Sequence, residues 1–193
     1  MKIAKLDEIS KIYFTTNDIA KALEIGPSSA KVSANRYCAK GYILRVKRGM
    51  YILKSRWETL SEKDLFALAN VLQVPSYISL TTALSYHGVT TQLQQGYIES
   101  IALKRTKSVE IKDIYFGYTR IGKSLYHGFS RQDGFFIASP EKAFLDALYL
   151  SIFAKYAFDT SSIEKGKLNP GKLHKLSKDL PERVRKEVKT WIS

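Results

Sequence analysis

Eight basic side chains lie between Ile25 and Trp57, and no acidic residue interrupts them. Ammonium and guanidinium groups in such an acid-free block can bind phosphate oxygens, which favours a nucleic-acid backbone as their ligand. A run of charge is more often an ordinary solvated face, so the local pattern around it must decide. The eight residues are Lys31, Arg36, Lys40, Arg45, Lys47, Arg48, Lys54 and Arg56.

Histidines, carboxylates and glycines elsewhere in the chain lack the spacing that metal binding, acid-base catalysis or phosphate binding requires. The three histidines are far apart and show no HxxxH or CxxC spacing for a metal ion. Glu141 and Asp146 are five residues apart, so they do not share a helix face as an acid-base pair would. Gly122–Ser124 reads GKS but lacks the upstream glycine of a phosphate-binding loop. We therefore expect no catalytic residues, no metal site, no cofactor and no enzyme activity.

Composition indicates a folded protein, and the cysteine content fits a reducing compartment. The 193 residues carry a net charge of +13, and 45% of them are hydrophobic and 12% aromatic, which is typical of a chain with a buried core. A single cysteine, Cys38, excludes an internal disulfide, so the cytoplasm is the expected location.

Neither apolar region of the chain looks like a membrane or export signal. The N-terminus interrupts its apolar residues with Lys5, Asp7 and Glu8, unlike a signal peptide. The apolar-rich run 143–158 contains Asp146 and Lys155 and is too short to span a bilayer. No membrane partner is expected.

The elements around the basic block predict a pair of helices. A first short helix would carry Leu6, Ile9 and Ile12 on one face and end near Phe14. A threonine N-cap with Asp18 in the first turn then starts a second helix. After the Gly-Pro break at 26–27, a third helix runs to about residue 40, and Ser28 or Ser29 is the expected cap.

A basic hairpin is predicted after these helices. Gly41 would end the third helix in the left-handed conformation. Residues 42–45 and 50–53 read as two strands around a turn that contains Gly49. Helix pair and hairpin together predict a winged helix-turn-helix, with the third helix in the DNA groove and the hairpin tip on the backbone beside it.

This arrangement selects a set of expected DNA contacts. The third helix would bury Ala30, Ala34, Tyr37 and Cys38 and turn its polar positions and Val32 outward, toward phosphates and base edges. The predicted DNA-binding residues are Ser28, Ser29, Lys31, Asn35, Arg36, Arg45, Lys47 and Arg48.

The remaining chain predicts an α+β second domain. Pro75 marks the expected boundary, which gives domains of residues 1–75 and 76–193. Ser139-Pro140-Glu141 is a strong helix start, with serine as N-cap and proline at the first helical position. Asp146 in that helix lies among large apolar residues, so it needs a buried partner such as a backbone N–H or an arginine.

Four segments, TTNDIAKAL, KGYILRVKRGMYIL, PSYISLTTALSYHGV and IASPEKAFLDALYL, resemble the AbiEi-type antitoxins of bacterial type IV toxin-antitoxin systems. They lie in this order between Thr15 and Leu150. The resemblance implies an N-terminal winged helix-turn-helix that binds double-stranded DNA of its own promoter as a repressor. It also implies a C-terminal domain that counters a nucleotidyltransferase toxin made from the adjacent gene.

Three other functions remain open at the level of sequence. The chain could be a regulator without a toxin, or an interaction module whose basic face binds an acidic protein. An enzyme that acts on nucleic acid is the third alternative, against which stand the missing metal and nucleophile motifs.

Overall fold

The computed structural model describes residues 3–92 and 94–192, and its contacts divide the chain into two compact units, residues 1–68 and 69–193. The division falls between Leu68 and Ala69, inside helix α5 (Glu62–Leu72) and ahead of Pro75. The expected domains are 1–75 and 76–193. Residues 1 and 2 of the first and residue 193 of the second lie outside the described residues.

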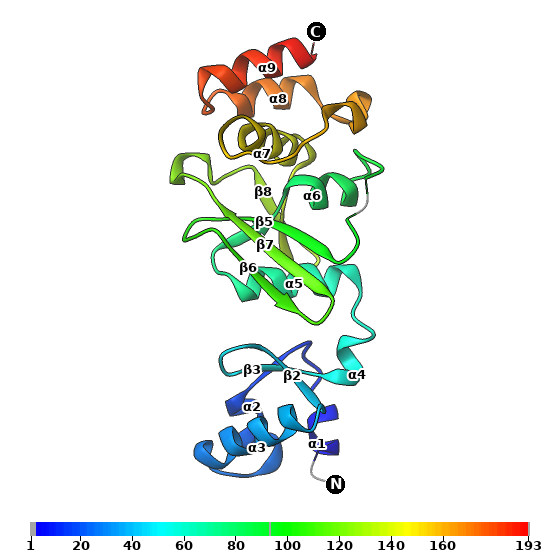
Figure 1. Cartoon of the computed structure of the whole chain (residues 1–193), viewed down its shortest axis with the longest axis vertical. Coiled ribbons are helices and arrows are strands. Elements are labelled where there is room, and N and C mark those ends of the chain that lie inside the picture. Colours follow the sequence, from blue (N-terminus) through cyan, green and yellow to red (C-terminus); the bar gives the residue numbers. More distant parts are fainter. Residues whose placement is uncertain (1–2, 93, 193) are drawn as a thin grey trace. The chain divides into compact units, whose positions relative to one another are not determined.

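The first unit joins short helices to a small antiparallel sheet (Figure 1). Strand β3 is central and pairs with β1 on one side and with β2 on the other. The elements are α1 (Ala4–Asp7), β1 (Phe14–Thr15), α2 (Thr16–Leu23), α3 (Pro27–Ala39), β2 (Ile43–Lys47), β3 (Met50–Leu53) and α4 (Lys54–Trp57).

Helix α2 starts with the predicted threonine cap. Thr15 Oγ1 accepts a hydrogen bond from Asp18 N (3.3 Å), and Asp18 Oδ2 accepts one from Thr15 N (2.7 Å). Such a reciprocal capping box satisfies backbone donors that a helix start otherwise leaves free. The next amide, Thr16 N, donates to Gly49 O (3.2 Å), which holds the β2–β3 turn against the start of α2.

The first helix differs from its prediction. Helix α1 ends at Asp7, and the chain is extended at Phe14–Thr15, where Phe14 pairs with Tyr51. Leu6 and Phe14 are fully buried, whereas Ile9 and Ile12 are only half-buried. The apolar residues that predicted one helix thus belong to two elements, α1 and β1, which contact the core separately. The strand pairing of Phe14 prevails over the helical spacing.

The second unit is built on a mixed sheet, which has six strands in the described part of the chain. Its order is β6-β7-β5-β4-β9-β8; β5 runs parallel to β7 and β4 parallel to β9, and the other pairs are antiparallel. The strands are β4 (Ser76–Ile78), β5 (Tyr97–Ala102), β6 (Lys107–Ile111), β7 (Ile114–Arg120), β8 (Phe129–Gln132) and β9 (Phe135–Ala138).

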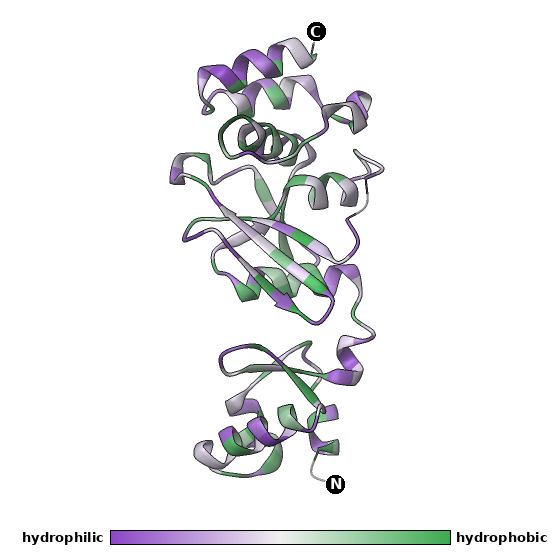
Figure 2. Cartoon of the chain, in the orientation of Figure 1, coloured by the Kyte–Doolittle hydropathy of each residue, from purple (hydrophilic) through white to green (hydrophobic). Residues whose placement is uncertain are grey.

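Helices cover parts of this sheet (Figure 1). Helix α6 (Leu80–Tyr86) packs on β5, and α7 (Pro140–Phe153) lies between the sheet and the pair α8 (Pro170–Ser177) and α9 (Glu182–Ile192). Figure 2 shows α7 as mostly hydrophobic and α9 as largely hydrophilic, as expected for a central and an outer helix. Short 3-10 turns lie at Lys123–Leu125, Thr160–Ser162 and Lys165–Lys167. No described helix combines the length and the apolar character needed to cross a membrane.

Helix α7 begins at the predicted signal and carries a buried ion pair. Ser139 Oγ caps the helix by accepting from Lys142 N (3.2 Å), and Pro140 follows at the first helical position. Asp146 is 2% exposed, and its carboxylate lies 2.7 Å from Lys142 Nζ. Tyr77 and Ser79 donate hydroxyl hydrogen bonds to the same carboxylate at 2.9 and 2.8 Å. The buried partner required for Asp146 is thus a lysine one helical turn away, together with two hydroxyls.

Lys142→Met should destabilise the second unit by about 3–5 kcal/mol, because it leaves the Asp146 carboxylate buried without its cation. Burial raises the pKa of Asp146 and Lys142 opposes that rise. The loss should therefore shrink as the pH falls and Asp146 takes up a proton. Urea unfolding followed by Trp191, whose ring lies 4.5 Å from that of Phe144 in α7, would measure this loss of stability.

Lys186→Met is the control variant, because it removes a lysine from the exposed pair with Glu182 and should cost less than about 1 kcal/mol. Equal losses for the two variants would contradict the role of the buried pair.

Candidate nucleic-acid interface

One face of α3 is buried in the first unit and the other is exposed. Ala30, Ala34 and Tyr37 lie in a core with Ile19 and Leu23 of α2. The two alanines permit close approach of the helices. This burial turns the opposite face outward, and all eight predicted DNA-binding residues are exposed: Ser28, Ser29, Lys31, Asn35, Arg36, Arg45, Lys47 and Arg48.

The start of α3 differs from the sequence prediction. Gly26 occupies the N-cap position and Pro27 the first helical position, so Ser28 and Ser29 lie inside the first turn. Pro27 fixes the entry, because its ring presets the helical φ and its missing N–H is not needed there. No side chain among the described residues caps this helix. Its first amides and both serine hydroxyls are therefore placed to donate to an anion.

Five exposed positions of α3 lie on one stripe. Residues 28, 31, 32, 35 and 36 recur at three- and four-residue spacing, which places them on one helix face. Val32 is 67% exposed in the middle of this polar stripe. The guanidinium of Arg36 lies 5.6 Å from the centre of the Tyr37 ring, a cation–π contact that restrains its direction. The stripe thus offers hydrogen-bond donors, two cations and one apolar contact.

The β2–β3 hairpin presents the other cations. Its pairing shifts between Arg45 and Lys47, and this bulge lets Val46 turn into the core while the two cations stay exposed. Gly49 adopts φ +74° in the tight turn, a conformation that favours glycine. Arg48 is exposed beside it. Figure 2 shows the turn between β2 and β3 as hydrophilic.

Acidic groups near these cations are occupied elsewhere. Glu24 pairs with Lys5 (2.9 Å), which holds the pKa of Glu24 below its usual value. Burial opposes ionisation of Asp18, but hydrogen bonds from Thr15 and Lys11 outweigh it and lower its pKa. Glu24 and Asp18, which precede the acid-free block, thus already have partners outside it.

Two members of the basic block, Lys54 and Arg56, lie in α4 rather than in α3 or the hairpin. Arg56 donates to the backbone oxygens of Lys11 and Asp7, so it ties α4 to the N-terminal segment. Lys54 is exposed at the start of α4, after the hairpin has ended. Neither is among the predicted DNA contacts, and the bonds of Arg56 indicate a structural role.

Cys38 is half-buried at the edge of the α3 core, less enclosed than the sequence predicts. Burial raises the pKa of its thiol, although Arg45 opposes the rise. A thiol with a raised pKa is a poor nucleophile at neutral pH. Across residues 3–92 and 94–192, no group of three or more His, Cys, Asp or Glu side chains could hold a metal ion.

Comparison with protein families supports the resemblance found in the sequence. Residues 1–54 match a family model described as "Transcriptional regulator, AbiEi antitoxin". The match runs from the N-terminus into α4 and includes all eight predicted contacts. The predicted resemblance to AbiEi-type proteins is thereby confirmed for this segment, and it suggests a regulator or antitoxin role. The description is that of a regulator rather than of an enzyme.

A solved structure shares the fold over nearly the whole chain. It is described as "Crystal structure of RV2827C protein from Mycobacterium tuberculosis". The two are 10% identical with a TM-score of 0.67, and the match covers 98% of this chain and 74% of the other. At this identity the likeness concerns the fold alone. No curated protein matches the sequence.

Proposed function

We propose, from the match of residues 1–54 to the AbiEi-type regulators, that this chain is a repressor that binds double-stranded DNA of its own promoter. Residues 1–75 are its DNA-binding domain, a winged helix-turn-helix with α2 and α3 as the helix pair and β2–β3 as the wing. The observation that carries the proposal is that α3 and the β2–β3 hairpin of the same unit both expose their cations, with no acidic residue between Ile25 and Trp57.

In this proposal α3 reads the major groove. Ser28, Ser29 and the first amides of α3 hold a phosphate and fix the register of the helix. Asn35 is suited to the paired donor and acceptor of adenine, and Val32 to the methyl group of thymine. Lys31 and Arg36 hold phosphates or guanine edges. Val32 is 67% exposed in this stripe, so a base methyl group can reach it.

The hairpin holds the DNA backbone. Arg45 and Arg48 are exposed on it, and Lys47 lies between them in sequence. Contacts from a wing to phosphates add affinity that does not depend on base sequence. Because Thr16 N binds Gly49 O, the tip is fixed to the helix pair and does not have to be ordered on binding.

A second activity is favoured by the family description, which includes the word antitoxin. We propose that residues 76–193 counter a nucleotidyltransferase toxin made from the adjacent gene. The support is the family match of residues 1–54 together with the division of the chain into two compact units, the second of which comprises residues 69–193.

Arg45→Ala and Arg48→Ala should each weaken binding to operator and random DNA by a similar factor, because they remove phosphate contacts. If the protein neutralises about five phosphates, the slope of log affinity against log salt is about −4 to −5, and each variant should reduce its size by about 1. Fluorescence anisotropy with a duplex from the region upstream of the gene and a scrambled duplex measures both. Lys123→Ala removes an equal charge from the second unit and should leave the slope unchanged. A wild-type slope near zero would rule out the electrostatic contact.

Asn35→Ala and Val32→Ala should instead reduce discrimination between operator and scrambled duplex, by about 1–3 kcal/mol for Asn35 and less for Val32. Replacing the contacted thymine with uracil, which lacks the methyl group, should therefore not weaken DNA binding by the Val32→Ala variant. The same anisotropy titration checks both variants. Equal losses on both duplexes would show that this face of α3 does not read bases.

Co-expression with the neighbouring nucleotidyltransferase gene should restore growth that the toxin alone arrests. The double variant Arg45→Ala, Arg48→Ala should still restore growth from an inducible promoter, because its second unit is intact. Plating efficiency with and without induction is the measurement. A toxin that stays active beside the stably expressed wild-type chain would remove the antitoxin proposal and leave the repressor proposal in place.

A further inference from the structure

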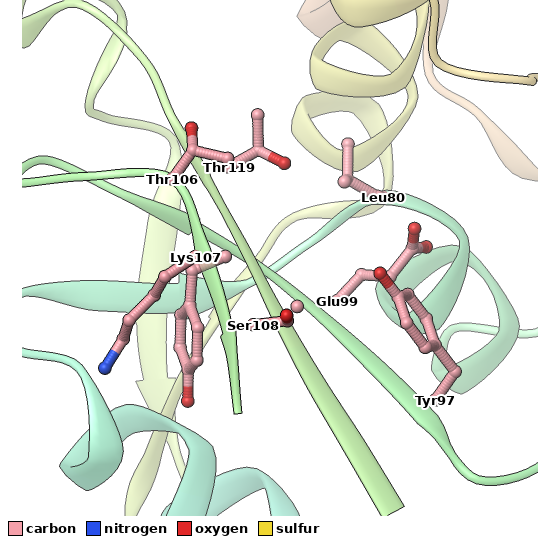
Figure 3. Close-up of a pocket in the computed structure, with 9 residues that line it drawn as sticks. Leu80, Tyr97, Glu99, Thr106, Lys107, Ser108 and Thr119 are labelled. Carbon is pink, nitrogen blue, oxygen red and sulfur yellow. The ribbon is translucent and has the colours of Figure 1, made fainter. Parts of the chain in front are cut away.

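A polar pocket of about 320 Å³ opens on the sheet of the second unit (Figure 3). Its floor is one row across three strands, because Glu99 of β5 pairs with Gly117 of β7, and Gly117 pairs with Ser108 of β6. Small residues at two of these positions leave the space open. Helix α6 covers the β5 side of this row through Thr81 N, which donates to Glu99 Oε2.

Tyr97 forms one wall of the pocket. A Cβ atom on Gly117 would come within 2.6 Å of Tyr97 Oη, so the glycine makes room for this ring over β7. Tyr97 remains 40% exposed. In Figure 3, Tyr97 and Glu99 lie on one side of the pocket, Ser108 at its middle, and Thr106 and Thr119 at the other end. The pocket therefore combines a carboxyl group, an aromatic ring and several hydroxyls.

The Glu99 carboxyl group is buried, and no cation among residues 3–92 and 94–192 is recorded in a salt bridge with it. Glu99 is 5% exposed, and its partners are neutral donors: Thr81 N at 3.0 Å and Tyr156 Oη at 2.9 Å, with the Thr82 backbone also favouring the charged form. Lys107, the one lysine that lines this pocket in the described residues, points away from Glu99 in Figure 3. Its ammonium donates to Leu72 O and lies 5.3 Å from the Tyr118 ring centre.

We propose that this pocket binds a small organic ammonium ion through Glu99, Tyr97 and the hydroxyls of the floor. An ammonium group has three donors, and a buried carboxylate that accepts from neutral groups alone is the acceptor it matches. The exposed Tyr97 ring supplies a cation–π wall, and Ser108 and Thr119 can accept the remaining donors. The volume admits a small ligand. This site is separate from α3 and the hairpin, so it does not depend on the repressor proposal.

Binding should be linked to the titration of Glu99. Burial raises its pKa to about 7, while hydrogen bonds from Tyr156 and the Thr81 and Thr82 backbone oppose the rise. Tyr97 and Tyr156, which face the same carboxyl group, have pKa values raised above the ordinary 10 and stay neutral. A cation prefers the ionised carboxylate, so affinity for an amine should increase as the pH rises from 6 to 8.

The test is a titration of the ¹⁵N-labelled full chain with putrescine at about 0.15 M salt, where distant charges are screened. We expect saturable amide shifts at Glu99, Ser108 and Gly117, with affinity that increases from pH 6 to pH 8. The control ligand 1,4-butanediol has the same length without charge and should cause no such shifts. Equal shifts from the diol, or shifts spread over all surface carboxylates, would overturn the proposal.

Two variants separate the site from general effects. Glu99→Gln keeps the size of the side chain but removes its charge, and should weaken putrescine binding at least about tenfold. Ser108→Val fills the floor from an exposed strand position and leaves the Glu99 contacts in place, so it tests the pocket even if Glu99→Gln folds poorly. Glu187→Gln removes a carboxylate from α9 and should bind as the wild type does. Unchanged affinity in Ser108→Val would also overturn the proposal.

Discussion

The arrangement of the first unit depends on a few hydrogen bonds where β1 meets α2. Thr15 is at once a strand residue paired with Met50 and the cap of α2, and its reciprocal bonds with Asp18 fix the direction in which the helix leaves the sheet. The next amide, Thr16 N, binds the carbonyl oxygen of Gly49. Sheet, helix and hairpin turn are thus joined within two residues. Because α3 packs on α2, these bonds also set where the exposed stripe of α3 lies relative to Arg48.

Charge in the first unit is sorted by these same contacts. Asp18 is used by the cap and by Lys11, and Glu24 is used by Lys5. Asp18 and Glu24 are thus paired with lysines outside the acid-free block, and the sequence places no acidic residue between Ile25 and Trp57. Arg56 shows that a basic residue in the same block can serve the fold instead, because its guanidinium binds backbone oxygens. The local density of basic residues alone does not distinguish the structural Arg56 from the exposed Arg45.

Sequence predicted the elements whose signals are local. Thr15 with Asp18, Gly41, Gly49 and Ser139 with Pro140 each fix the backbone within a few residues, and α2, the hairpin and α7 begin or end where these signals indicate. The prediction failed at Phe14, where a distant strand competed with a local period, and at the start of α3, where two local signals competed.

Four details illustrate these limits. Phe14 is drawn into a strand by Tyr51, which shortens the first helix. Ser28 and Ser29 are good caps in isolation, but Gly26 and Pro27 begin α3 before either serine can cap it. Val32 was placed outward by its spacing, yet a valine alone gave no reason to include it among the contacts. The pocket around Glu99 needed the pairing of three strands, which no local signal in the sequence encodes.

Asp146 and Glu99 show why burial alone does not define a site. Both carboxyl groups are almost fully enclosed, and both accept hydrogen bonds from tyrosine hydroxyls. Asp146 has its cation on the same helix, with Lys142 at 2.7 Å, so its charge is satisfied within the fold and the pair specifies how α7 seats on β4. Glu99 has neutral donors, and the lysine beside it in the pocket wall is directed to another acceptor. Because burial raises the pKa of Glu99 to about 7 despite its hydrogen bonds, the group either holds its proton at and below neutral pH or is kept ionised by a cation from solution. The open pocket next to Glu99 gives a cation from solution access to the carboxylate, and that access distinguishes a binding group from a structural one.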